Sequence, residues 1–213
     1  MKYGNLEIET GEDVYEPSED TFLCAASLNG LLRASKTGIR VLDMGCGTGL
    51  LGLLAAKSKK VSSVLLCDIN TRAVTLAEEN YKSNMLKFNA KCRFLCTDLF
   101  SKVPRSEKFD IMMFNTPYLP ENHLQPRLHS DERMWNGGKR GIETAEKFLK
   151  GAVSHAASHG ADVLLISSSF ADIERLSKTA ARLGYTETAE KKIHIFFEDI
   201  ICFVLGLRNR ALT

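Results

Sequence analysis

The chain has 213 residues, of which 44% are hydrophobic and 25% are charged, and its formal net charge is only +2. This length and balance predict one globular domain over residues 1–213. The overall charge does not indicate a long-range attraction to nucleic acid, although a local basic patch stays open, and no apolar run is long enough to cross a bilayer. The polar, acidic N-terminus is unlike a signal peptide and none of the 6 cysteines forms a C-x-x-C pair, so we expect a reducing, cytoplasmic setting and no metal site.

Short apolar strands and helices alternate along most of the chain, beginning with a helix that we expect Ser18 to cap. Strands are predicted at residues 39–44, 61–67, 91–97, 109–114 and 161–167. Helices are predicted at residues 50–56, from a Thr71 cap through residue 77, and at residues 143–156 and 170–183. Two β-like stretches, from about residue 194 to residue 207, end the chain without a helix between them. This order predicts a doubly wound, mostly parallel α/β sheet of the Rossmann-like type, with an antiparallel C-terminal strand.

A glycine-rich turn, Asp43-Met44-Gly45-Cys46-Gly47-Thr48-Gly49, follows the first predicted strand and opens a helix. Glycine at positions 45, 47 and 49 allows a sharp turn and the close approach of a ligand to the backbone. A bare G-x-G pattern is also typical of an ordinary tight turn between a strand and a helix. Here a second acid, Asp68, ends the next strand about 25 residues on, where a ribose-binding acid is expected. The turn therefore predicts a nucleotide-like ligand.

The acids at the strand ends indicate which ligand this is. Asp43 lies at the turn itself, where it would repel the pyrophosphate of a dinucleotide. S-adenosyl-L-methionine instead carries a sulfonium and an ammonium group, which a nearby acid favours. Asp98 ends the third strand, where it is either an acceptor for the adenine amino group or a simple turn cap. We therefore predict S-adenosyl-L-methionine as the cofactor.

Three motifs in sequence order carry a resemblance to a known family. Phe114-Asn115-Thr116-Pro117-Tyr118 ends the fourth strand and is similar to the amino-methyltransferase signature Asn-Pro-Pro-Tyr. Together with Val14-Tyr15-Glu16-Pro17-Ser18-Glu19-Asp20-Thr21 and the later Trp135-Asn136-Gly137-Gly138, it makes the chain resemble the HemK-like glutamine methyltransferases of the archaeal and eukaryotic branch. The resemblance runs from about Val14 to the final strand. It departs from the family at Thr116, where the family has proline.

The resemblance implies a seven-stranded methyltransferase sheet with the third strand at one edge, and a front motif that folds over the cofactor. The implied cofactor contacts, to which the glycine turn adds Gly47 and Gly49, are Thr21, Asp43, Gly45, Asp68, Asp98, Leu99 and Asn115. A small zinc-binding activator protein is also implied, and we expect it on the edge strand from Lys91 to Thr97, because an apolar unpaired edge needs a cover. The implied substrate is the glutamine of the Gly-Gly-Gln loop in a class I translation release factor.

The expected catalytic residues are Asn115, Thr116, Pro117 and Tyr118. An amide nitrogen is a poor nucleophile because its lone pair is delocalised. The Asn115 side-chain oxygen and the backbone carbonyl of Thr116 can each accept one N–H of a substrate –NH2 group, while Tyr118 offers a flat face for stacking. Threonine keeps the carbonyl that this chemistry uses but loses the fixed φ of proline, so we expect retained catalysis at an equal or lower rate.

Other functions fit the same residues. A nucleic-acid adenine N6-methyltransferase uses the same Asn-x-Pro-Tyr geometry, but such an enzyme usually needs a broad basic surface or a recognition domain, so nucleic acid is the less favoured substrate. A protein lysine methyltransferase stays open, as does a scaffold that binds the cofactor and a partner but, because of Thr116, transfers nothing. Four basic residues after the catalytic turn either bound a substrate entrance or form a solvated surface: Arg127, Arg133, Lys139 and Arg140.

Overall fold

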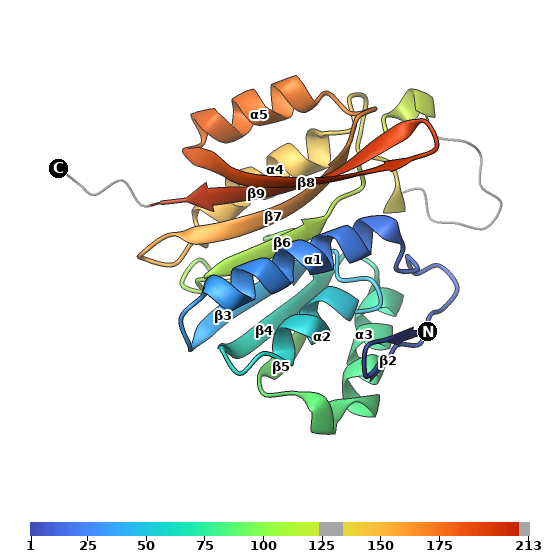
Figure 1. Cartoon of the computed structure of the whole chain (residues 1–213), viewed down its shortest axis with the longest axis vertical. Helices are drawn as coiled ribbons and strands as arrows, with labels where there is room; N and C mark the ends of the chain where they lie inside the picture. Colours follow the sequence, from blue (N-terminus) through green and yellow to red (C-terminus); the bar gives the residue numbers. More distant parts are fainter. Residues whose placement is uncertain (124–133, 209–213) are drawn as a thin grey trace.

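The computed structural model describes residues 1–123 and 134–208, and a seven-stranded sheet forms its centre (Figure 1). In chain order the strands are β3 (Ile39–Met44), β4 (Val61–Asp68), β5 (Lys91–Cys96), β6 (Ile111–Asn115), β7 (Ala161–Ser168), β8 (Tyr185–Ile195) and β9 (Glu198–Leu207). They lie side by side in the order β5-β4-β3-β6-β7-β9-β8. The first five are parallel to one another, whereas β9 runs antiparallel to both β7 and β8. The predicted doubly wound, mostly parallel sheet with an antiparallel C-terminal strand is therefore confirmed.

The chain reverses its direction across the sheet between β3 and β6. From β3 it steps outward through β4 to β5, and it then returns to β6 and steps the other way to β7. In open α/β sheets, ligands bind at the carboxyl ends of the strands where such a reversal occurs. Met44 at the end of β3 pairs with Phe114 near the end of β6, so the glycine turn and the Asn-Thr-Pro-Tyr turn leave the sheet side by side.

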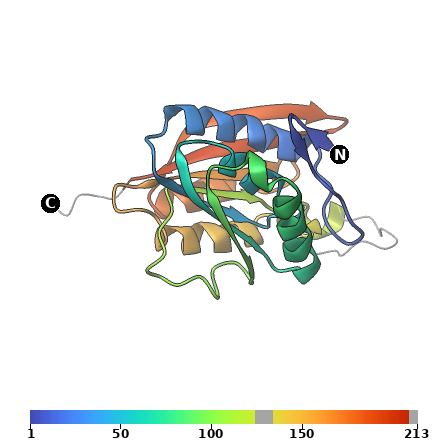
Figure 2. The same cartoon turned by 90° about the horizontal axis from the view of Figure 1, so that it is seen from below.

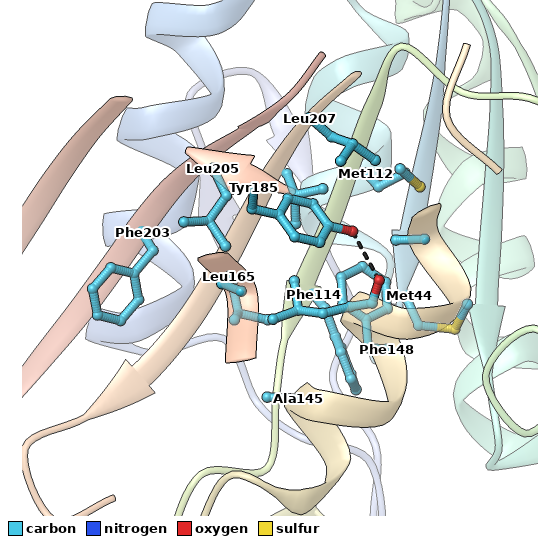
Figure 3. Close-up of a cluster of buried hydrophobic side chains, with 14 of the residues drawn as sticks. Met44, Met112, Phe114, Ala145, Phe148, Leu165, Tyr185, Phe203, Leu205 and Leu207 are labelled. Carbon is cyan, nitrogen blue, oxygen red and sulfur yellow. Dashed lines mark hydrogen bonds between the residues drawn. The ribbon is translucent and has the colours of Figure 1, made fainter. Parts of the chain in front are cut away.

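Helices cover both faces of the sheet (Figure 2). They are α1 (Glu19–Ala34), α2 (Leu50–Ala56), α3 (Thr71–Ser83), α4 (Glu143–Val153) and α5 (Ile173–Arg182). Because successive strand residues point to opposite faces, Val41 of β3 joins the buried cluster of α1 and α2, and Leu42 joins that of α4 and α5. Figure 3 shows the second cluster, where Phe148 of α4 lies among strand side chains and the Tyr185 hydroxyl donates to the Leu149 carbonyl oxygen over 2.8 Å. Within residues 1–123 and 134–208, no helix is both long and apolar enough to cross a membrane.

A short hairpin that we did not predict from the sequence precedes α1. Its strands are β1 (Lys2–Tyr3) and β2 (Leu6–Glu7), and the Leu6 side chain is fully buried against α2. Two amide side chains of the α3 segment hold the backbone that follows. Asn84 pairs with the N–H and carbonyl of Glu7, and Asn80 pairs with those of Glu9. This tether fixes the path of the N-terminal segment toward the carboxyl edge of the sheet.

Several predicted helix and strand ends were wrong. Asn70, not Thr71, caps α3: its side chain accepts a backbone N–H two residues on. Ser18 does occupy the N-cap position of α1, but its hydroxyl makes no capping bond and donates to the Asp20 carboxylate over 3.0 Å. The helix predicted to reach residue 156 ends at Val153, and the terminal hairpin begins at residue 185 rather than at about residue 194.

Candidate active site

A cavity of about 410 Å³ opens at the carboxyl ends of β3, β4 and β6. Three segments far apart in sequence line it: the N-terminal segment before α1, the turns that follow the strands, and the loop before α4. The predicted site residues in the lining are Gly45, Gly47, Asp68, Asp98, Leu99, Asn115, Thr116, Pro117 and Tyr118. Thr21, Asp43 and Gly49 are the predicted residues that lie behind this lining.

The glycine turn forms the floor of the cavity. Gly45, Gly47 and Gly49 all have positive φ, a conformation that glycine adopts without the strain of a side chain. At Gly45 a Cβ atom would lie 2.7 Å from the Phe114 ring, so a side chain there would displace that ring. At Gly47 the nearest atom to such a Cβ would be the Tyr15 carbonyl oxygen at 3.5 Å, an ordinary contact. Gly45 is therefore required for packing, whereas Gly47 keeps the cavity open.

Two strand-end acids face the cavity from β4 and β5. The Asp68 carboxylate accepts the Gly47 N–H over 2.9 Å and the Asn70 N–H over 2.9 Å, so backbone donors on both sides of the strand end fix its position. Asp98 is exposed and Leu99 next to it has a positive φ of 45°. The two acids therefore offer carboxylate oxygens to a ligand along one side of the cavity.

Asp43 lies beneath the glycine turn and is only 1% exposed. Its carboxylate accepts the Gly52 N–H over 2.7 Å. Burial raises the pKa of Asp43 to about 7, the negative charge of Asp68 adds to the rise, and the Gly52 hydrogen bond opposes it. Its influence on a ligand would act through its charge, across the turn, rather than through direct contact.

The Asn-Thr-Pro-Tyr turn forms the wall opposite the acids. The Asn115 side-chain nitrogen Nδ2 donates to Thr21 Oγ1 over 3.3 Å, while its oxygen Oδ1 is buried and has no hydrogen-bond partner among the described residues. The Thr116 hydroxyl donates to the Ile166 carbonyl oxygen of β7 over 2.8 Å. Tyr118 is 9% exposed, and its hydroxyl donates to Asp20 over 3.2 Å. Asn115 Oδ1 is thus a buried acceptor of this wall that lacks a donor among the described residues.

The motif Trp135-Asn136-Gly137-Gly138 supports this wall from behind. The Leu119 N–H donates to the Trp135 carbonyl oxygen and the Gly137 N–H donates to the Leu119 carbonyl oxygen, each over 2.9 Å. A Cβ atom at Gly137 would lie 2.7 Å from the Pro117 carbonyl oxygen, so only glycine allows this close approach. The Trp135 ring also packs edge-on against Tyr15 of the first motif, with ring centroids 4.9 Å apart. All three motifs therefore meet around one cavity.

Asp20 is the site residue that the sequence analysis missed. It is 2% exposed and accepts hydrogen bonds from the hydroxyls of Tyr15, Ser18, Thr21 and Tyr118. Burial and the adjacent Asp20 charge raise the pKa of both tyrosines, so these phenols stay protonated donors. A signal was present, because residues 20, 24 and 28 of α1 share one helical face and are all buried.

The basic residues that we singled out are only partly described. Arg127 and Arg133 lie outside the described residues. Lys139 and Arg140 are exposed, and Arg140 forms ion pairs with Glu143 and Asp172 at 3.8 and 4.0 Å. Such exposed pairs contribute little to stability, and neither lysine nor arginine lines the cavity in the described part of the loop.

Sequence comparisons decide the family. The family model described as "Methyltransferase small domain" matches residues 26–196. "Putative protein N5-glutamine methyltransferase" of Methanocaldococcus jannaschii is 31% identical over 92% of this chain and 93% of its own length. "Methyltransferase HEMK2" of Homo sapiens is 30% identical over 64% of each chain. The chain belongs to the methyltransferase small-domain family, in its HemK-like branch.

Solved structures share the fold of this HemK-like methyltransferase. The E. cuniculi Mtq2-Trm112 complex contains a chain that aligns with a TM-score of 0.65 at 22% identity, covering 92% of this chain and 99% of that chain. P. horikoshii TYW2 in complex with MeSAdo aligns with a TM-score of 0.66 at 14% identity, covering 98% of this chain and 70% of that chain. At these identities the likeness establishes the fold alone.

Proposed function

We propose that this methyltransferase uses S-adenosyl-L-methionine to methylate the N5 side-chain nitrogen of a glutamine in another protein. The observation that carries the proposal is the side-chain oxygen of Asn115. This residue ends β6 and lines the cavity, and its Oδ1 is buried without a hydrogen-bond partner among the described residues. A buried acceptor without a donor costs about 1–3 kcal/mol, so its retention is best explained by a ligand that brings an N–H to it.

The residues present fit the cofactor. Asp68 and Asp98 offer carboxylate oxygens to the hydroxyl and amino groups of a nucleoside, and Gly45 and Gly47 leave room for close contact. A cluster of acids including the buried Asp43 suits a ligand that carries positive charge and no phosphate. Gly45, Gly47, Asp68 and Asp98 would therefore hold the cofactor, with Leu99 packing beside it.

The chain's own part in catalysis is to bind and orient the acceptor nitrogen. Asn115 Oδ1 and the Thr116 carbonyl oxygen would each accept one N–H of the substrate –NH2 group, which draws electron density toward the nitrogen and fixes its direction. The Tyr118 ring would support one face of the planar amide. When bound, the cofactor would supply an electrophilic methyl group to this nitrogen and would leave as its neutral thioether, and the proton lost from the methylated nitrogen would pass to solvent.

The names of relatives support a release factor as the substrate. "Release factor glutamine methyltransferase" of Chlamydia trachomatis is 31% identical over 65% of this chain and 47% of its own length. The E. cuniculi complex is described as responsible for the methylation of the eRF1 translation termination factor. We therefore propose the glutamine of the Gly-Gly-Gln loop in a class I release factor as the acceptor, which would place the enzyme with translation in the cytoplasm.

The deciding experiment is the transfer of a labelled methyl group from S-adenosylmethionine to a purified release factor. Wild-type enzyme should label the factor, and labelling should be lost with Asn115→Ala in the enzyme or with Gln→Ala in the Gly-Gly-Gln loop. A duplex oligonucleotide and a lysine-containing peptide serve as competing acceptors. Labelling of either one, with the release factor unlabelled, would overturn the proposed substrate. Cofactor binding without transfer to any acceptor would support the scaffold hypothesis instead.

We also propose that a small zinc-binding activator protein covers the free edge of β5 and forms a heterodimer with this chain. Cys92, Phe94, Leu95 and Cys96 of this edge strand are only half-buried, and Leu86 just before it is fully exposed. An unpaired edge with apolar side chains favours association with another chain. The chain in the E. cuniculi structure is itself in complex with Trm112. Soluble, stable and fully active protein purified alone would contradict this proposal.

A further inference from the structure

The orientation of the Asn115 side chain decides whether the proposed chemistry works. An asparagine amide has an acceptor oxygen on one side and an NH2 donor on the other, and a rotation by half a turn exchanges them. Only one orientation offers Oδ1 to a substrate N–H. In the other orientation, NH2 would face NH2 and the acceptor nitrogen would be repelled. Something in the protein must therefore fix the amide before the substrate arrives.

The Asp20 carboxylate determines which atom of the Asn115 amide faces Thr21. An ionised carboxylate only accepts hydrogen bonds, so each hydroxyl that contacts it must donate. Thr21 Oγ1 donates its single proton to Asp20 Oδ1 over 3.0 Å, and Tyr15 and Tyr118 donate to the other oxygen over 2.6 and 3.2 Å. With its proton committed, the Thr21 oxygen can only accept. The group 3.3 Å away on Asn115 must then be the donor Nδ2.

We propose that Thr21, polarised by Asp20, is a positioning residue that holds Asn115 with Oδ1 facing the methyl acceptor. The inference rests on the proposed function and goes beyond it, because it assigns the orientation of the catalytic amide to the N-terminal segment. A flipped amide would set Oδ1 against the Thr21 oxygen with no proton between them. Thr21 is 5% exposed and Asp20 is 2% exposed, so water does not relieve that clash.

Burial also explains why this role belongs to Thr21 rather than to a contact on the cavity surface. Thr21 stands behind Asn115 and does not line the cavity, so a ligand can enter without displacing it. The bond joins residues 94 positions apart, between the first turn of α1 and the end of β6. The front motif therefore acts on catalysis through Asn115, from a position behind the lining of the cavity.

The test compares Thr21→Val, which keeps the shape but loses the acceptor oxygen, with Thr21→Ser, which keeps the hydroxyl. At saturating cofactor and release factor, Thr21→Val should lower kcat about 10-fold, the loss of roughly one good hydrogen bond, and Thr21→Ser should restore most of it. The cofactor Kd, measured by calorimetry, should change much less than kcat. In an Asn115→Ala background, Thr21→Val should have no further effect on kcat, because the group it positions is gone.

A second readout does not depend on activity. In protein labelled with 15N-asparagine, the Asn115 side-chain NH2 signal, assigned by its absence from Asn115→Ala, should exchange slowly with water in the wild type and in Thr21→Ser. It should exchange much faster in Thr21→Val, provided thermal melting confirms that the variant is folded. Equal exchange in wild type and Thr21→Val, or a loss confined to cofactor Kd, would overturn the positioning role. Slow exchange that depends on Thr21 in an enzyme that methylates no glutamine would instead overturn only the proposed function.

Discussion

The two halves of the cavity are built in different ways. We call the wall formed by Gly45, Gly47, Asp68 and Asp98 the glycine-turn half, and the wall formed by Asn115, Thr116 and Tyr118 the asparagine half. In the glycine-turn half, the bonds of Asp68 reach residues 21 and 2 positions away. In the asparagine half, the side-chain bonds join residues 50, 94 and 98 positions apart.

This contrast indicates which half depends on the complete fold. Three neighbouring strands and the turns that follow them are enough to assemble the glycine-turn half, since β3 pairs with β4 and β4 pairs with β5. The asparagine half needs β7 and the first turn of α1 to arrive before its polar groups point correctly. We therefore expect substitutions in the glycine-turn half to act mainly on binding, and those in the asparagine half to act mainly on the rate of transfer.

Loss of the Asn115 side chain should give the largest effect. Asn115→Ala removes the acceptor that orients the substrate nitrogen, so kcat should fall by about 10²–10³-fold, as for the loss of other preorganised polar groups in active sites. Cofactor Kd should change far less. Steady-state kinetics and calorimetry on the same preparation measure both quantities, with Asn5→Ala at an exposed turn as the matched control. A loss of affinity as large as the loss of rate would break the division between the two halves.

Asp43 should make the stability of the ligand-free protein depend on pH. Its native pKa of about 7 exceeds the value of about 3.9 expected in the unfolded chain, so between these values the folded state binds more protons. Stability should therefore fall as pH rises, by about 2–3 kcal/mol between pH 5 and pH 8. Urea unfolding across this range measures the slope. Asp43→Asn keeps an acceptor for the Gly52 N–H and should flatten the curve; an unchanged slope would show that other groups cause it.

Loss of the Asp68 charge should weaken cofactor binding and leave the rate of transfer unchanged. Asp68→Asn keeps the shape but removes the charge that two backbone N–H groups and a ligand hydroxyl would share. Charge-assisted bonds of this kind contribute about 1.5–3 kcal/mol, so cofactor Kd should rise by about 10–100-fold. At saturating cofactor, kcat should stay close to that of the wild type. Calorimetry provides the Kd. Asp162→Asn, near the start of β7 and outside the cavity lining, serves as the control.

The central sheet could be predicted from the sequence because its buried strands are short apolar runs, which can be recognised without knowing which strands pair with them. The prediction misplaced the start of β8, since all of residues 186–194 are exposed and this stretch is a strand only through its pairing with β9. It also failed for β1 and β2, which have two residues each and so carry no periodicity. Both errors concern strands that tertiary pairing defines.

The candidate site divides in the same way. The glycine turn, the strand-end acids and the Asn-Thr-Pro-Tyr turn are local patterns, so their meeting at one edge followed from the parallel sheet. That Asp20 faces Tyr118 could not be predicted, because the two residues are 98 positions apart. The helical spacing of Asp20 with Cys24 and Leu28 indicates that Asp20, and not the exposed Glu19, is on the buried face, but the contact of Asp20 with Tyr118 depends on how α1 packs.

Thr116 offers the smallest but most specific test of the asparagine half. The resembled family has proline here, which fixes φ without a side-chain bond, whereas this chain ties the same turn to β7 through the Thr116 hydroxyl and the Ile166 carbonyl oxygen. If this bond replaces the rigidity of proline, Thr116→Val should lower kcat about 2–10-fold, the range of one net hydrogen bond, and Thr116→Ser should lower it less. Thr116→Pro should retain activity near that of the wild type, because the ring restores the restraint that the hydroxyl supplied. Equal losses in Thr116→Val and Thr116→Pro would mean that the threonine serves another purpose. The predicted order would show that a hydrogen bond to the neighbouring strand β7 restrains this turn as the proline ring does.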